Sequence, residues 1–425
     1  MTFPKPHRIT LPNGLRVVVV PMRGNPTVTV EVLVEAGSGH EDKKVNGISH
    51  FLEHMCFKGT KNRSTAHVIA NEFEEIGAQN NAFTGEEYTG YWAKARTKHF
   101  EHIFDIVADL FLNPLLPAKE LEKERGVVIQ EINMYDDQPR SVVGDALDEL
   151  MYGDQPAGRT ILGTKENIRT LTRQDLVAYR EKHYVASKTL IVVAGGITIS
   201  HVVRLARKYF GHLPKEKALR KPPVKEQQSK PALVVKPKKT QQTHFLLAFR
   251  GFSANDPRFI AARGLARVLG SGMSSRLFQK LREEMGVCYY ANSRATGRTD
   301  YGVFVIQAGV DNNRLEEVVT VILKEVQKLK EILIPEKELK KTKEMAVSSI
   351  EMGLESSDAM ADWYGIPELL RFKRQTPEQA QKEIRRVTAK QLQSVAKVLL
   401  KNSTMNFAVI GPVKNKEKLK RLLKI

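Results

Sequence analysis

A repeat at half the chain length most constrains how this 425-residue sequence can fold. The segment from residue 165, KENIRTLTRQDLVAYREKHYVASKTLIVVAGGI, aligns without a gap with the segment from residue 381, QKEIRRVTAKQLQSVAKVLLKNSTMNFAVIGPV. Each segment predicts a capped helix followed by a buried strand. Self-similarity at a fixed offset is typical of a duplicated structural unit. We therefore expect two copies of one domain.

The order of elements within each half indicates the fold class. Strands such as LRVVVV and TVTVEVLVEAG open the first half, and THFLLAFRG opens the second. Long amphipathic helices follow in both halves. Strands followed by runs of helices are typical of an α+β layer rather than a doubly wound parallel sheet. We expect an α+β fold with two homologous domains, at residues 1–213 and 241–425, each an antiparallel-rich sheet packed by helices.

A basic stretch lies between the two halves. The net charge of +19 raises nucleic acid or an anionic membrane as partners. Between residues 215 and 239, however, nine lysines and arginines accompany two glutamates and four prolines. No aromatic side chain interrupts this run to stack on bases. We therefore expect a solvated linker at residues 214–240, and neither a nucleic-acid nor a membrane partner.

The sequence also bears on the compartment. No run of about 18 apolar residues occurs, and the first residues, MTFPKPHRITLPNGLRVVVVP, resemble neither a signal peptide nor an organelle leader. Cys56 and Cys288 are the two cysteines, so a disulfide framework is excluded. These features favour a cytoplasmic protein.

The segment ISHFLEHMCFKGT, residues 48–60, places two histidines and a glutamate inside an apolar run. On a helix, His50 and His54 lie within about 40° of each other, with Glu53 about 60° to their other side. Two such histidines can share a zinc ion, and Glu53 is placed to act as a general base. The alternative is a pair of histidines in a core helix whose hydrogen-bonding groups find partners within the protein. The second half has no such motif, so the halves differ in function.

A catalytic zinc ion needs a third protein ligand. The helical segment ELEKERGVVIQEINMYDDQP offers Glu124 and Glu131, seven residues apart and on one face. One can bind the metal while the other holds a ligand from behind, and the spacing does not say which; an exposed acidic helix is the alternative. Cys56 lies about 120° around the helix from His50, so we expect a small buried hydrophobe there.

Four segments together resemble the pitrilysin/insulinase zinc metallopeptidases, in the processing-peptidase branch of prokaryotic type. They are HFLEHMCFKGT, NNAFTGEEYTGYW, ERGVVIQEI and SSRLFQKLREEMGVCYY, and the match spans nearly the whole chain. The first contains H-x-x-E-H, the inverse of the common H-E-x-x-H motif. The resemblance implies duplicated α+β domains and one Zn²⁺ per chain. It implies Glu131 as the third ligand and Glu124 as the acid behind the ligands.

The resemblance also implies how a peptide substrate is held. Asn81, Ala82 and Phe83 match the sheet edge that hydrogen-bonds the substrate backbone. Arg282 and Tyr289 match a pair that binds the substrate backbone and the developing oxyanion respectively.

One departure concerns specificity. Mitochondrial processing enzymes carry an acidic pair, used for arginine-bearing presequences, at the positions that Ser141 and Asp145 occupy here. Half of the pair is missing. Asp145 therefore remains as a substrate-binding candidate, and strict recognition of an arginine presequence is not expected.

These features predict a zinc metalloendopeptidase that hydrolyses unstructured peptides or presequence-like segments inside a closed chamber. In double-length relatives the metal domain faces the fourth domain, whereas one chain here supplies two. The resemblance therefore implies a homodimer in which Arg282 and Tyr289 act on the partner's zinc site. A non-catalytic core-type subunit or scaffold of the same fold is the alternative, but such a subunit is expected to lose part of the motif.

Overall fold

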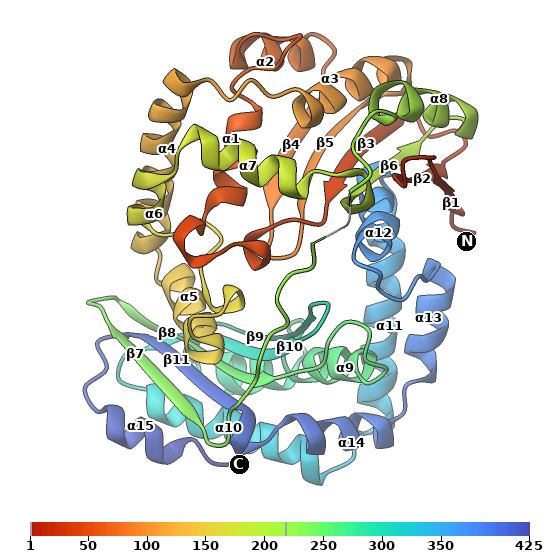
Figure 1. Ribbon diagram of the computed structural model, residues 1–425. Coiled ribbons are helices and arrows are strands. Elements are labelled where there is room, and N and C mark those ends of the chain that lie inside the picture. Colours follow the sequence, from red (N-terminus) through yellow and green to blue (C-terminus); the bar gives the residue numbers. More distant parts are fainter. Residues whose placement is uncertain (1, 217–218) are drawn as a thin grey trace. The chain divides into compact units, whose positions relative to one another are not determined.

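A computed structural model describes residues 2–216 and 219–425 (Figure 1). The chain forms two compact units. The first unit comprises Met1–Asn133, Arg159–Pro222 and Ile350–Glu378, and the second comprises Met134–Gly158, Pro223–Ser349 and Gln379–Ile425. The units therefore differ from the two halves of the sequence: residues 134–158 of the first half belong to the second unit, and residues 350–378 of the second half belong to the first unit.

A six-stranded sheet forms the centre of the first unit. Its order is β1-β2-β6-β3-β5-β4, and every neighbouring pair is antiparallel except β2–β6. The antiparallel-rich sheet expected from the sequence is confirmed. The strands are β1 (His7–Thr10), β2 (Arg16–Pro21), β3 (Thr27–Val34), β4 (Gln79–Thr84), β5 (Thr89–Arg96) and β6 (Thr189–Gly195).

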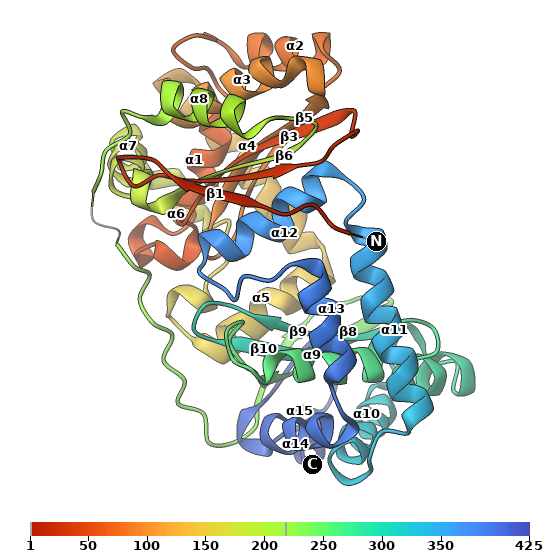
Figure 2. The same cartoon turned by 90° about the vertical axis from the view of Figure 1, so that its right-hand side faces the viewer.

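Helices cover both faces of this sheet. On one face, alternating residues such as Val17 and Val19 pack in a core with helices of the first half. On the other face, Val18 and Val20 pack against Met360 of α12 (Ser357–Leu369), which lies beside the sheet in Figure 2. The remaining helices are α1 (Ile48–Cys56), α2 (Ala66–Glu75), α3 (Phe100–Leu112), α4 (Ala118–Asp137), α6 (Lys165–Thr170), α7 (Arg173–His183) and α8 (Ile199–Phe210).

The second unit repeats this plan. Its sheet has the order β7-β11-β8-β10-β9, with β7–β11 parallel and the other pairs antiparallel. The strands are β7 (Ala232–Pro237), β8 (Gln242–Arg250), β9 (Cys288–Gly297), β10 (Gly302–Asp311) and β11 (Met405–Gly411). The helices are α5 (Pro139–Tyr152), α9 (Phe259–Gly270), α10 (Leu315–Glu331), α11 (Glu336–Gly353), α13 (Pro377–Arg386), α14 (Ala389–Leu399) and α15 (Lys416–Leu422), and η6 (Phe278–Glu284) is π-helical.

The predicted repeat is present in the structure. Helices α7 and α14 each begin with a capping box, at Thr172 and Thr388. Each helix leads into a fully buried strand, β6 or β11, that ends in a glycine of positive φ, at Gly195 and Gly411. The strand order β2-β6-β3-β5-β4 corresponds to β7-β11-β8-β10-β9. The duplicated domain inferred from the sequence is therefore present.

One part of the expected organisation differs. Strand β7 lies inside the stretch 214–240, which the sequence led us to expect as linker, and it is the counterpart of β2. Its residues are mostly half-buried and flanked by proline and lysine, so they lack the apolar alternation of a core strand. The second copy thus begins before residue 241.

Short 3₁₀ turns complete the described chain: η1 (Ser38–His40), η2 (Lys43–Val45), η3 (Thr97–His99), η4 (Pro156–Gly158), η5 (Ala186–Lys188) and η7 (Asn402–Thr404). Within residues 2–216 and 219–425, no helix combines the length and the apolar character needed to cross a bilayer. Both cysteines are buried free thiols. Burial raises the pKa of Cys56 to about 11, and the residue packs in the core of the first unit as expected.

Candidate metal centre

Helix α1 presents the histidine motif, and a buried carboxylate fixes its start. The first N–H groups of a helix have no intrahelical partner. Here Glu41 accepts hydrogen bonds from the N–H groups of Gly47 (2.7 Å) and Ser49 (2.8 Å). The opposite side of α1, including Phe51 and Met55, is fully buried in the core. Anchored in this way, α1 directs His50, Glu53 and His54 to one side.

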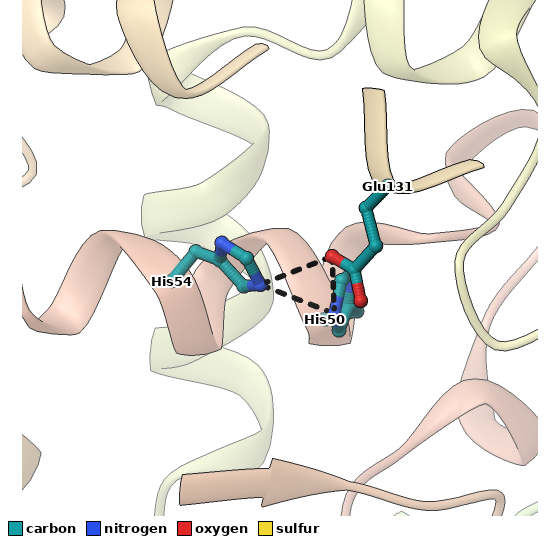
Figure 3. Close-up of side chains that lie close together, drawn as sticks. All are labelled: His50, His54 and Glu131. Carbon is teal, nitrogen blue, oxygen red and sulfur yellow. Dashed lines mark hydrogen bonds and ion pairs between the residues drawn. The ribbon is translucent and has the colours of Figure 1, made fainter. Parts of the chain in front are cut away.

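Three side chains converge at this point (Figure 3). His50 Nε2 and His54 Nε2 lie 3.2 Å apart, and Glu131 Oε2, from α4, lies 3.6 Å from each of them. One potential ligand atom from each residue lies within 4.8 Å of the others. Among the described residues, this is the one such group of three or more histidine, cysteine or acidic side chains. The structure thus brings together the three residues that the resemblance implies as metal ligands.

The geometry fits a zinc ion. Tetrahedral zinc with Zn–N bonds of ~2.0–2.1 Å separates two nitrogen ligands by about 3.3 Å, close to the distance between the two imidazoles. Burial, followed by the proximity of His54, lowers the pKa of His50 to about 3. His50 is therefore neutral and carries a lone pair for a metal. Two imidazole nitrogens and one carboxylate are a common set for zinc with an open fourth position.

Glu124 lies behind His54. Its Oε1 accepts a hydrogen bond from His54 Nδ1 (2.8 Å), and its Oε2 pairs with Lys58 Nζ (2.6 Å). Burial alone would raise the pKa of Glu124, but the bonds from His54 and Lys58 outweigh it and lower that pKa. A proton on Nδ1 leaves Nε2 free to bind the metal. Glu131 thus lies beside the Nε2 atoms of both histidines and Glu124 lies behind His54, and the metal-binding role that the resemblance implies for Glu131 stays a prediction.

We expect Glu124→Gln to weaken zinc binding by about 10- to 100-fold, the usual cost of losing a partner that orients a ligand. Titration of the apoprotein with Zn²⁺ in competition with a chelating dye measures this. Glu120→Gln is the matched control, because Glu120 lies on the same helix but pairs with Lys123. An unchanged affinity in Glu124→Gln would show that His54 is oriented without it.

Glu53 is held by a contact that the sequence did not predict. Thr84 Oγ1, at the end of β4, donates a hydrogen bond of 2.5 Å to Glu53 Oε2. Burial is the largest influence on Glu53 and raises the pKa of its carboxyl, whereas the bond from Thr84 opposes that shift. The other oxygen of Glu53 is not engaged by Thr84. The carboxylate is thus tied at one oxygen, beside the ligand cluster.

Sequence reasoning missed three residues that support the site: Glu41, Lys58 and Thr84. Lys58 and Thr84 lie inside segments that carry the resemblance, HFLEHMCFKGT and NNAFTGEEYTGYW, but neither follows a helical or strand period that reveals its partner. One signal could have indicated Glu41: acidic residues are common just before the start of a helix, where they can accept hydrogen bonds from its first N–H groups.

Asn81, Ala82 and Phe83 lie on β4, the last strand of the first sheet. In the described chain, β4 pairs with β5 alone, so its other edge is a template for an added strand. The N–H of Ala82 donates to Asn81 Oδ1 (2.9 Å). The Phe83 ring packs edge-on against Tyr88, with centroids 5.6 Å apart, and fills the space beside Gly90. Because its ring is packed within the unit, Phe83 has its backbone rather than its side chain available to an added strand.

The remaining predicted residues belong to the second unit. Tyr289 is 67% exposed on the edge strand β9. Arg282, also exposed, lies on η6 and donates to the carbonyl of Cys288 (2.8 Å). Asp145 lies on an exposed side of α5. The ligand cluster belongs to the first unit, so the roles of Arg282, Tyr289 and Asp145 stay predictions.

Comparison with known families gives two matches. Residues 16–165 match the family described as insulinase (peptidase family M16). Residues 170–346 match the peptidase M16 inactive domain.

Individual relatives match along almost the whole chain. The chain is 36% identical over 413 residues to the uncharacterized zinc protease YmxG of Bacillus subtilis, covering 96% of this chain and 98% of that protein. It is 31% identical over 420 residues to the beta subunit of the mitochondrial-processing peptidase of Saccharomyces cerevisiae, covering 94% and 90%. A protease from Helicobacter pylori has the same fold, with a TM-score of 0.92, 26% identity and coverage of 97% and 100%.

Proposed function

Because this chain belongs to the pitrilysin/insulinase family of peptidases (peptidase family M16), in its processing-peptidase-like branch, we propose that it is a zinc-dependent metalloendopeptidase. The observation that carries the proposal is the cluster of His50, His54 and Glu131 with a tethered Glu53 beside it. Its substrates are unstructured peptides or presequence-like segments. Hydrolysis takes place inside a chamber formed by a dimer.

The side chains of α1 and α4 have different roles in the proposed site. His50, His54 and Glu131 hold one zinc ion, and Glu124 keeps His54 oriented. When bound, zinc would supply a Lewis acid and would lower the pKa of water at the open position to about 7. Glu53 takes a proton from the attacking water and delivers it to the departing amine.

The edge strand β4 binds the substrate. An extended peptide adds to the free edge through backbone hydrogen bonds, while side-chain pockets set the specificity. Asn81, Ala82 and Phe83 provide that edge. Such binding requires an unpaired, extended substrate, which is why we propose unstructured peptides as the class.

A second candidate function is a non-catalytic subunit or scaffold of the same fold. The match of residues 170–346 to an inactive domain favours it. That match covers mainly the second copy, which lacks the histidine motif, whereas the first copy retains the complete set. Catalysis therefore remains the better-supported function.

We expect the purified protein to contain zinc and to cleave an unstructured fluorogenic peptide. A chelator should stop cleavage and added Zn²⁺ should restore it, because the site without metal lacks its Lewis acid. Metal analysis and initial rates measure this. Glu53→Gln, purified in the same way, controls for a contaminating protease. Cleavage that persists in the zinc-free protein, or that equals the rate of Glu53→Gln, would support the non-catalytic subunit.

We also propose that the active form is a homodimer in which Arg282 and Tyr289 act across the interface. A Glu53→Gln chain mixed with an Arg282→Ala/Tyr289→Phe chain, each inactive alone, should regain part of the activity when subunits exchange. The reason is that a two-fold dimer places each set of residues against the partner's complementary set, so a hybrid contains one complete site. Native mass spectrometry establishes that hybrids form. Hybrids that form and stay inactive would rule out action in trans.

A further inference from the structure

The hydrogen bond between Thr84 and Glu53 joins two parts of the first unit that lie 31 residues apart in the sequence. Thr84 is the last residue of β4, and Glu53 lies in the middle of α1. The hydroxyl donates and the carboxylate oxygen accepts, at 2.5 Å. Hydrogen bonds to a charged acceptor are shorter and about twice as strong as neutral ones. This contact therefore restrains the Glu53 side chain.

We propose that Thr84 is a positioning residue for the Glu53 carboxylate, an inference that rests on the function proposed above. A glutamate side chain has three torsions, and the last of them is broad. Fixing Oε2 to Thr84 restricts the rotation of the carboxylate. It reserves Oε1 for the proton of the attacking water. Thr84 itself need not touch the substrate.

The position of Thr84 is in turn fixed by its surroundings. Thr84 pairs with Thr89 across the hairpin, and Gly85 N–H closes the turn on the carbonyl of Tyr88 (2.8 Å). A Cβ on Gly37 would lie 2.2 Å from the Gly85 carbonyl oxygen, so the segment that leads to α1 touches this turn closely. Backbone hydrogen bonds from the N–H of Ser38 to the carbonyl of Gly85 (3.2 Å) and from the N–H of Gly39 to the carbonyl of Glu86 (2.7 Å) hold the turn against this segment. A catalytic side chain keeps a precise position only when the residues that hold it are themselves held rigidly.

The arrangement has a consequence for catalysis. The three residues of the proposed substrate edge, Asn81, Ala82 and Phe83, directly precede Thr84 on the same strand. One strand thus aligns the peptide backbone and, through Thr84, the base that activates the water. Small misplacements of a catalytic group lower the rate of the chemical step strongly. Loss of the Thr84 hydroxyl should therefore affect kcat rather than substrate binding.

The test compares variants of Thr84 with a variant of Thr89, the two residues that flank the turn of the hairpin. Thr84→Val removes the hydroxyl and keeps a β-branched side chain that suits a strand. We expect kcat to fall by about 10- to 100-fold, as for a lost hydrogen bond to a charged group. KM and zinc content should stay unchanged. Thr84→Ser should recover most of kcat, because it restores the donor.

Thr89→Val is the matched control. Thr89 lies opposite Thr84 in the register and is fully buried, and its hydroxyl donates to the carbonyl of Ala36 (2.9 Å) rather than to Glu53. This variant should lower the melting temperature, since a buried carbonyl loses its donor, while kcat is retained. Thr84→Ala also removes the hydroxyl, and it replaces Thr84→Val in the comparison if the valine variant does not fold.

Three outcomes would overturn the inference: kcat of Thr84→Val within about twofold of wild type, a rise in KM with unchanged kcat, or a serine variant as slow as the valine variant. Glu53→Gln in the same assay separates this inference from the proposed function. If Glu53→Gln is inactive and Thr84→Val is fully active, the positioning role alone is wrong. If Glu53→Gln keeps the wild-type kcat, the proposed function itself is wrong.

Discussion

Glu53→Gln is expected to lose peptide hydrolysis by at least about 100-fold while one zinc ion per chain stays bound. An amide cannot accept the proton of the attacking water, and general-base catalysis typically contributes 10²- to 10⁴-fold. The three metal ligands are untouched, so the metal should remain. Steady-state kinetics and metal analysis of the same preparation measure both quantities.

Glu74→Gln is a suitable control for this substitution. Glu74 is an exposed glutamate on α2, outside the ligand cluster, so the same chemical change should leave both activity and zinc unaffected. A Glu53→Gln protein that loses its zinc together with its activity would make Glu53 a ligand, and the assignment of the base would be wrong.

Glu131→Gln is expected to cost most of the zinc affinity, and the activity with it. The variant puts a neutral amide in place of the carboxylate whose Oε2 lies 3.6 Å from the Nε2 atoms of both His50 and His54. Because a bound metal stabilises the folded state, the rise in melting temperature on adding Zn²⁺ should shrink or vanish. Isothermal titration with Zn²⁺ gives the affinity.

Comparison among the variants sharpens this prediction. A large excess of Zn²⁺ should restore part of the activity to Glu131→Gln but none to Glu53→Gln, because mass action can refill a weakened site and cannot replace a base. Full zinc occupancy in Glu131→Gln combined with loss of zinc in Glu124→Gln would reverse the roles of the two glutamates.

The part of the site that could be predicted from the sequence is the part built on one helix. His50 and His54 must share a face of any α-helix because they are four residues apart. Glu124 and Glu131 share a face of their helix for the same reason, so periodicity could not distinguish them. The choice of Glu131 came from the family resemblance. Geometry then separates them, since Glu131 lies beside both histidines and Glu124 behind one.

The missed contacts depend on tertiary structure. Thr84 reaches Glu53 only after the β4–β5 hairpin packs beside α1, and Glu41 caps α1 only after the preceding loop folds back. Neither contact joins residues at a spacing that a helix or a strand would bring together. The same limit applies to the fold. The repeat and the α+β class followed from the pattern of strands and helices, whereas β7 resembled a linker because lysines and prolines surround its short apolar run.

The exchange of segments between the units has a practical consequence for dissecting the protein. A fragment that ends at residue 213 would contain every strand of the first sheet but not α12. One face of that sheet would then present to water the apolar side chains that α12 normally covers. Exposed apolar surface of this kind promotes association between molecules. A truncated zinc-binding half is therefore a poor reagent, and a soluble version needs residues 350–378 appended as a covering segment. The apolar side chains concerned are Val18, Val20, Leu33, Leu190 and Val192.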